Sequence, residues 1–148
     1  PATATDQYLI VEDFFPTILE MARVRNYKTV QNVDGKTFVP VLKNPVSKNS
    51  ERFLIWHFPN KWQPDGPGIN YKSAIRQGDW KLIYHMRTAQ LELFNLKEDI
   101  GESTDVSKKY PDKVKVLSSA LSSQLKKWAA AMPVTKSTNK TVPFSDEL

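Results

Sequence analysis

Two histidines, His57 and His85, are the side chains best suited to acid–base or metal chemistry in this 148-residue sequence. Neither lies at metal-ligand spacing from another histidine or from a cluster of carboxylates, and an isolated histidine in a strand is more often structural than a ligand. Cysteine is absent, which excludes disulfides, thiolate zinc sites and thiol nucleophiles. The sequence also lacks a Gly-x-Ser-x-Gly motif and a glycine-rich phosphate loop. Residue chemistry alone therefore indicates no catalytic constellation.

One segment, residues 57–72, combines residue types that bind ligands. It contains three prolines, two glycines and Trp62, and prolines hold a loop in place by limiting its conformational freedom. The Trp62 indole could lie against a sugar ring or a base, while Lys61 and His57 could add charge and hydrogen bonds. His57, Lys61 and Trp62 are therefore candidate ligand-binding residues. The alternative is that Trp62 packs this loop against another domain.

The net charge of +5 is concentrated at the C-terminal end. Residues 1–107 hold 13 basic and 13 acidic side chains, whereas residues 108–148 hold 8 lysines and 3 acidic side chains. Such a lysine-rich segment has two readings. It could bind nucleic acid or another polyanion, or it could be a solvated helix face. The segment has no arginine, which favours the second reading, and we expect no nucleic-acid partner. No run approaches the ~18 apolar residues of a membrane span, so none is predicted.

The pattern of apolar residues predicts an N-terminal helix followed by a sheet. The first helix should run from about Glu12 to Val24, with Pro16 in its first turn. Residues 26–50 form a connection in which Thr37 could cap one short helical turn. Four segments rich in β-branched and aromatic residues predict strands, at 52–58, 71–77, 80–85 and 91–96. Gly78-Asp79 predicts a two-residue hairpin turn, and at least the last three strands should pair antiparallel.

A second helix, from Pro111 to about Met132, should cover this sheet. Its apolar face comprises Val114, Leu117, Leu121, Leu125 and Trp128. Burial of this face contributes roughly 8–15 kcal/mol in gross terms, at about 1.5–3 kcal/mol for each side chain. The polar residues 134–148 should form a loose tail or an arm over another surface. The predicted fold class is α+β: a four-stranded antiparallel sheet covered by a C-terminal amphipathic helix.

An ordered set of local motifs resembles the C-terminal part of sulfatases. Residues 12–20, EDFFPTILE, resemble the Asp-x-x-Pro-Thr-Leu-Leu helix late in the sulfatase catalytic domain. Residues 34–42, DGKTFVPVL, are similar to the stretch that follows that helix, and residues 56–59, WHFP, to the strand that opens the C-terminal subdomain. Residues 73–83, SAIRQGDWKLI, match the hairpin most typical of the family. The resemblance extends over about residues 6–130.

The resemblance implies that the chain is a fragment of a sulfatase. Residues 1–50 would be the tail end of the catalytic domain, residues 51–132 the antiparallel subdomain and residues 133–148 a polar tail. The N-terminal helix would then belong to the missing catalytic domain, which is the expected partner. In this family the subdomain lends loops to the substrate cleft, so the resemblance implies that His57, Lys61 and Trp62 bind the non-sulfate part of the substrate. Such a parent would use calcium or magnesium and a formylglycine residue to hydrolyse a sulfated glycan or aryl sulfate, and export of the parent is the expectation.

The family's functional motif does not occur in this sequence. Sulfatases form formylglycine from a Cys or Ser within a Cys/Ser-x-Pro/Ala-x-Arg motif, and their metal ligands lie upstream of the part represented here. We therefore expect no catalytic residue, no metal ligand and no hydrolysis by the chain alone. The alternative function is a free-standing carbohydrate- or polyanion-binding module.

Overall fold

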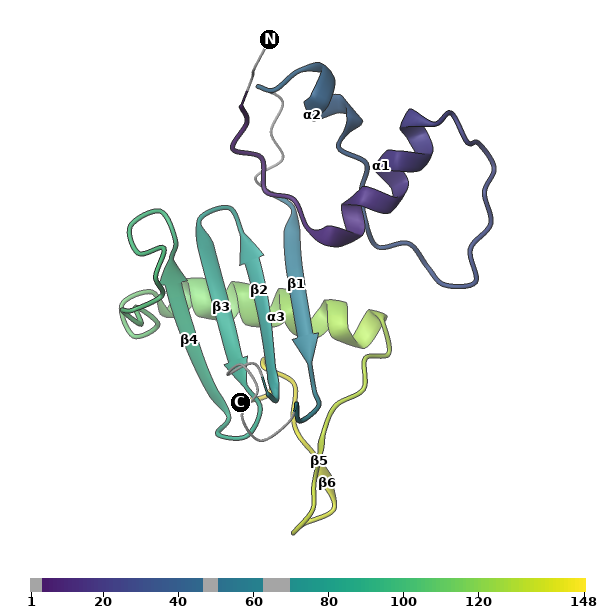
Figure 1. Ribbon diagram of the computed structural model, residues 1–148. Coiled ribbons are helices and arrows are strands. Elements are labelled where there is room, and N and C mark those ends of the chain that lie inside the picture. The colour runs from purple at the N-terminus through teal and green to yellow at the C-terminus, as the bar shows by residue number, and fades with distance from the viewer. Residues whose placement is uncertain (1–3, 47–50, 63–69) are drawn as a thin grey trace. The chain divides into compact units, whose positions relative to one another are not determined.

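The computed structural model describes residues 4–46, 51–62 and 70–148, and the chain divides into two compact units, Pro1–Arg52 and Phe53–Leu148. The first unit contains a 3₁₀ turn η1 (Val11–Asp13), helix α1 (Phe14–Met21) and helix α2 (Val39–Lys43). The second contains β1 (Phe53–Phe58), β2 (Lys72–Gln77), β3 (Trp80–His85), β4 (Gln90–Asn95), α3 (Pro111–Lys127), β5 (Val134–Thr135) and β6 (Lys140–Thr141) (Figure 1). No helix among the described residues is sufficiently long and apolar to cross a membrane.

Helix α1 is shorter than the predicted helix from Glu12 to Val24. The chain enters it through the 3₁₀ turn η1, and Pro16 occupies its first turn, where a missing N–H is tolerated. Regular helix ends at Met21 because Arg23 adopts the left-handed conformation, with φ of 59°. The N–H of Val24 then donates to the carbonyl of Leu19, which closes the helix end. The apolar pattern continues past Met21, so the pattern alone overestimates the length of the helix.

The sheet has the predicted strands in the order β1-β2-β3-β4, and all neighbours pair antiparallel. Gly78 has a φ of 56°, which suits the first position of the hairpin turn between β2 and β3. The register aligns Ile55, Ile75, Leu82 and Leu93 in one row across the sheet. The α+β fold with a four-stranded antiparallel sheet is therefore confirmed.

Helix α3 lies across one face of the sheet, and the core of the second unit sits between them (Figure 1). Its fully buried leucines, Leu117, Leu121 and Leu125, pack against sheet residues such as Ile75 and Leu82. The helix ends at Lys127, not at Met132, because Ala129 is left-handed with φ of 49°. Trp128, predicted on the buried face, caps this end and remains 40% exposed.

Residues 134–148 form a short hairpin and then return to the second unit. β5 and β6 pair antiparallel. The Tyr84 hydroxyl, on a fully buried side chain, donates to the carbonyl of Pro143 at 2.8 Å. The Ser145 hydroxyl lies 3.1 Å from both the carbonyl of Ser118 and the hydroxyl of Ser122 on α3. This segment is therefore an arm packed on its own unit, not a loose tail.

Candidate functional site

His57 lies on β1, and both of its ring nitrogens have partners within the second unit. Nδ1 is 2.7 Å from the hydroxyl of Ser73 on β2, and Nε2 is 2.9 Å from the carbonyl oxygen of Ala131, beyond the end of α3. A carbonyl only accepts, so Nε2 carries a proton and donates it. In the neutral ring, Nδ1 then accepts from Ser73. His57 thus ties the edge of the sheet to the segment after α3, and its imidazole is occupied by protein groups.

Lys61 and Trp62 follow β1 directly, and the structure leaves both accessible. The indole of Trp62 is 54% exposed and lies 6.0 Å from the ring of Phe58, between ring centroids. The backbone N–H of Trp62 donates to the Asn70 side-chain oxygen at 2.6 Å, which fixes the start of the loop. Residues 63–69, the rest of the predicted ligand loop, lie outside the described residues. The arrangement offers an apolar plate and an ammonium group, which suits binding of a ligand.

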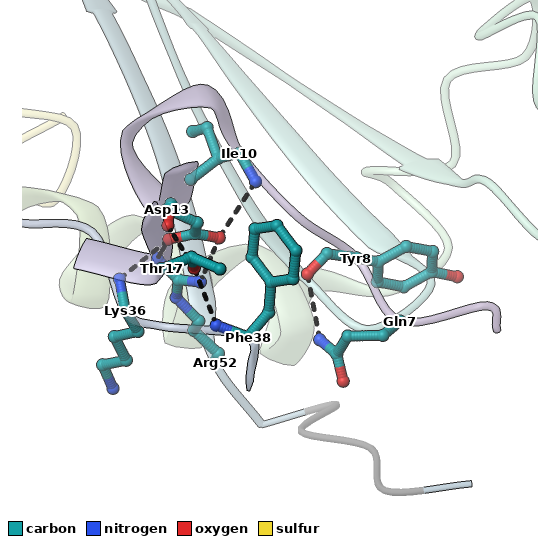
Figure 2. Close-up of polar contacts among 8 residues, drawn as sticks. All are labelled: Gln7, Tyr8, Ile10, Asp13, Thr17, Lys36, Phe38 and Arg52. Carbon is teal, nitrogen blue, oxygen red and sulfur yellow. Dashed lines mark hydrogen bonds and ion pairs between the residues drawn. The ribbon is translucent and has the colours of Figure 1, made fainter. Parts of the chain in front are cut away.

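Among the residues that the structure describes, the most buried charge belongs to Asp13 in the first unit, and the sequence did not indicate it as a site. Asp13 is fully buried, and its two carboxylate oxygens each accept from one nitrogen of the Arg52 guanidinium at 2.7 Å (Figure 2). The backbone N–H groups of Lys36 and Ile10 donate to the same carboxylate at 2.9 and 3.1 Å. Burial alone would raise the pKa of Asp13, but the hydrogen bonds from Arg52 and the two backbone groups outweigh it and lower the pKa.

A neighbouring threonine completes this polar cluster. The Thr17 hydroxyl donates to the Asp13 carbonyl at 2.6 Å and accepts from the N–H of Phe38 at 3.0 Å (Figure 2). The cluster thus links α1 to the residues before α2 and to Arg52, the last residue of the unit. Every hydrogen-bonding position of the Asp13 carboxylate is used, so the cluster is a structural junction with no vacant position for a ligand.

Among residues 4–46, 51–62 and 70–148, no group of three or more His, Cys, Asp or Glu side chains could hold a metal ion. The other histidine, His85, contacts Glu92 at 2.5 Å across β3 and β4.

Known proteins include relatives of this chain. The family profile described as N-sulphoglucosamine sulphohydrolase, C-terminal, matches residues 1–131. A sulfatase from Formosa agariphila is 30% identical over 131 residues, which cover 84% of this chain and 23% of that protein. An uncharacterized sulfatase from Schizosaccharomyces pombe is 29% identical over 123 residues, which cover 76% of this chain and 20% of that protein.

The fold is also found in solved structures. The structure of BT4656 in complex with its substrate D-glucosamine-2-N,6-O-disulfate matches 79% of this chain and 24% of that chain, with a TM-score of 0.62 and 24% sequence identity. At that identity, the match shows the fold only. The chain thus spans between a fifth and a quarter of the length of the relatives it matches. The chain belongs to the N-sulphoglucosamine sulphohydrolase C-terminal family and is the C-terminal part of a sulfatase.

Proposed function

We propose that this chain packs against the catalytic portion of a sulfuric ester hydrolase and contributes a loop to its substrate cleft, without hydrolysing sulfate esters by itself. The observation that carries the proposal is the apolar face of α1 and η1, which stays largely exposed even though Phe14 contacts Phe38 and Phe15 contacts Tyr27 edge to face. Its members expose between 47% and 76% of their surface: Val11, Phe14, Phe15, Ile18 and Met21.

The size of this face is typical of a surface that is covered in a complete protein. Full burial of a large apolar side chain contributes about 1.5–3 kcal/mol, and these five are roughly half-exposed, so covering them would contribute on the order of 5 kcal/mol. Isolated exposed apolar residues are normal, but a contiguous set on one helix marks an interaction site. The sulfatase relatives are four to five times longer than the matched region, which supports a partner within the same kind of protein.

The loop after β1 is the segment that we propose for substrate contact. Trp62 would offer its exposed indole to a sugar ring, and Lys61 would offer its ammonium group to a sulfate. His57 would act as a positioning residue, because both of its nitrogens are held by Ser73 and Ala131. The family description and the substrate named for BT4656 support a sulfated glucosamine-containing glycan as the substrate class.

The cofactors of the parent are part of this proposal. We expect a calcium or magnesium ion and a formylglycine, which together supply a nucleophile and neutralise the charge of the sulfate oxygens. The residues of this chain do not fit either group: the sequence has no cysteine and no Ser-x-Pro/Ala-x-Arg motif, and its described residues form no cluster of metal-ligating side chains. We therefore assign both groups to the catalytic portion.

Hydrolysis of an aryl sulfate ester by the purified chain tests this proposal. The chain is incubated with nitrocatechol sulfate and calcium, and release of the catechol is followed by absorbance, with a known sulfatase as positive control. The expected result is no turnover above buffer. Turnover that scales with the chain's concentration and persists through a second purification step would contradict the proposal.

A further inference from the structure

Four side chains at the start of α3 and the start of β3 form a compact group, which we call the lysine–aromatic cluster: Trp80, Lys109, Tyr110 and Lys113. The rings of Trp80 and Tyr110 meet edge to face, with centroids 4.9 Å apart and planes at 69°. The Lys113 ammonium lies 5.3 Å from the Trp80 ring centroid, and the Lys109 ammonium lies 5.2 Å from that of Tyr110. The rings thus hold two cationic groups in defined positions.

The charge of this cluster is uncompensated, unlike the charges of Lys81 and Lys126 in the same unit. Lys126 pairs with Glu147 at 2.8 Å, and Lys81 pairs with Glu102 at 2.6 Å. Within the part of the chain that the structure describes, Lys109 and Lys113 have no carboxylate at ion-pair distance. Residues 108–115 contain four lysines and one aspartate, a local net charge of +3. The cluster is therefore a cationic patch with its charges available to an anion.

The cluster lies at the opposite end of the sheet from the loop proposed for substrate contact. Trp80 pairs with Gln77, which pairs with Phe53 at the beginning of β1, whereas Lys61 and Trp62 follow Phe58 at its end. Five residues of extended strand separate the two ends by about 17 Å. A ligand at the lysine–aromatic cluster would thus be separate from the one at Trp62 unless it were a long polymer.

We propose that the lysine–aromatic cluster is an accessory binding site for a sulfated polysaccharide. The two ammonium groups would bind sulfate groups along the polymer, and the partly exposed ring of Tyr110 would contact the apolar face of a sugar ring. The two rings meet edge to face, so they cannot sandwich a nucleic-acid base between them, and residues 108–148 contain no arginine for bidentate phosphate binding. The choice of a sulfated sugar over other polyanions rests on the proposed function.

Titration of the 148-residue chain with a heparin dodecasaccharide, by calorimetry, tests this site. The double variant Lys109→Ala/Lys113→Ala removes both cluster charges, and Lys136→Ala/Lys140→Ala removes two exposed lysine charges from the β5–β6 hairpin as the matched control. We expect about a tenfold loss of affinity for the cluster variant and less than a twofold loss for the control. A desulfated, N-acetylated dodecasaccharide should bind at least tenfold more weakly than heparin.

Two further measurements separate a glycan site from general charge attraction. Tyr110→Leu leaves the charge unchanged and should weaken heparin binding about threefold, with the fold checked by circular dichroism and the unfolding midpoint. Duplex DNA of equal charge should displace heparin only at tenfold higher concentration. Equal losses for the two lysine pairs, equal binding of the desulfated sugar, or equal competition by DNA would overturn the proposal. Binding requires no turnover, so failure here leaves the aryl sulfate result for the proposed function unaffected.

Discussion

Replacing Asp13 with asparagine should destabilise the first unit locally, around the polar cluster of Asp13, Thr17 and Arg52. The substitution keeps the shape of the side chain but leaves the Arg52 guanidinium with little exposure and no counter-charge. In the native chain the Asp13 carboxylate accepts four hydrogen bonds. The substitution replaces one of its acceptor oxygens with an NH2 group, which cannot accept and would face two of these donors. Breaking a buried ion pair by removing one partner costs about 3–5 kcal/mol. We take about 3 kcal/mol here, because Arg52 keeps some contact with water.

Amide hydrogen exchange measures this loss at the atoms concerned. The N–H groups of Ile10 and Lys36 donate directly to Asp13, so their protection reports the local opening free energy. A loss of about 3 kcal/mol corresponds to exchange roughly a hundredfold faster. Asp34→Asn is the matched control, since Asp34 is exposed in the same unit. Equal exchange at these amides in the two variants and the native chain would refute the reasoning.

The same carboxylate gives the first unit a dependence on pH. The pKa of Asp13 is lowered from its ordinary value of 3.8 in the folded chain, so the folded state binds its proton less readily than the unfolded state. Its stabilisation is therefore present above about pH 3.8 and is lost as the pH falls through the lower, folded pKa. Protection of the two amides, corrected for intrinsic exchange rates, should fall below pH 3.8 in the native chain and stay level in Asp13→Asn.

Three further substitutions test the packing of each unit. Gly35→Ala would place a methyl group 1.9 Å from a backbone oxygen and should destabilise the first unit by about 1–3 kcal/mol. Gly101→Ala would place its methyl group 3.8 Å from the Asp99 Oδ1, an ordinary contact, and should be neutral by hydrogen exchange. Tyr84→Phe removes the hydrogen bond to Pro143 and should cost about 1 kcal/mol in urea unfolding, with earlier proteolytic release of the C-terminal arm. His57→Leu leaves two partners unpaired and should cost about 1–3 kcal/mol in the same assay, followed by tryptophan fluorescence; an unchanged midpoint would contradict its structural role.

The fold of the second unit follows from local patterns, while helix ends do not. Alternating residues and the Gly78 turn place the strands to within about one residue, because period and turn chemistry are local properties. Helices α1 and α3 both end earlier than predicted, at Met21 and Lys127. In each case the second residue after the helix, Arg23 or Ala129, is left-handed. Neither is glycine, so side-chain type gives no signal for the break. The packing of the C-terminal arm on α3 could not be predicted, because serines such as Ser118 and Ser122 are typical of a helix surface. In the structure both are buried beneath the arm.

The same contrast between local and long-range information applies to the candidate site. Residue type alone selected His57, but its partners, Ser73 and Ala131, are 16 and 74 residues away, so only the structure shows that its ring is occupied. The Asp13–Arg52 pair spans 39 residues and has no spacing rule that could reveal it. Substrate contact by Lys61 and Trp62 stays a prediction.

The central claim is that another part of a sulfatase covers the apolar face of α1. Binding of the dye ANS to this face tests the claim most directly. Ile18 on α1 and Val116 on α3 are each 59% exposed, so Ile18→Asp and Val116→Asp remove similar apolar area. We predict strong ANS fluorescence for the native chain, a loss of more than half in Ile18→Asp and little change in Val116→Asp. Equal fluorescence in the two variants, or none in the native chain, would contradict the account.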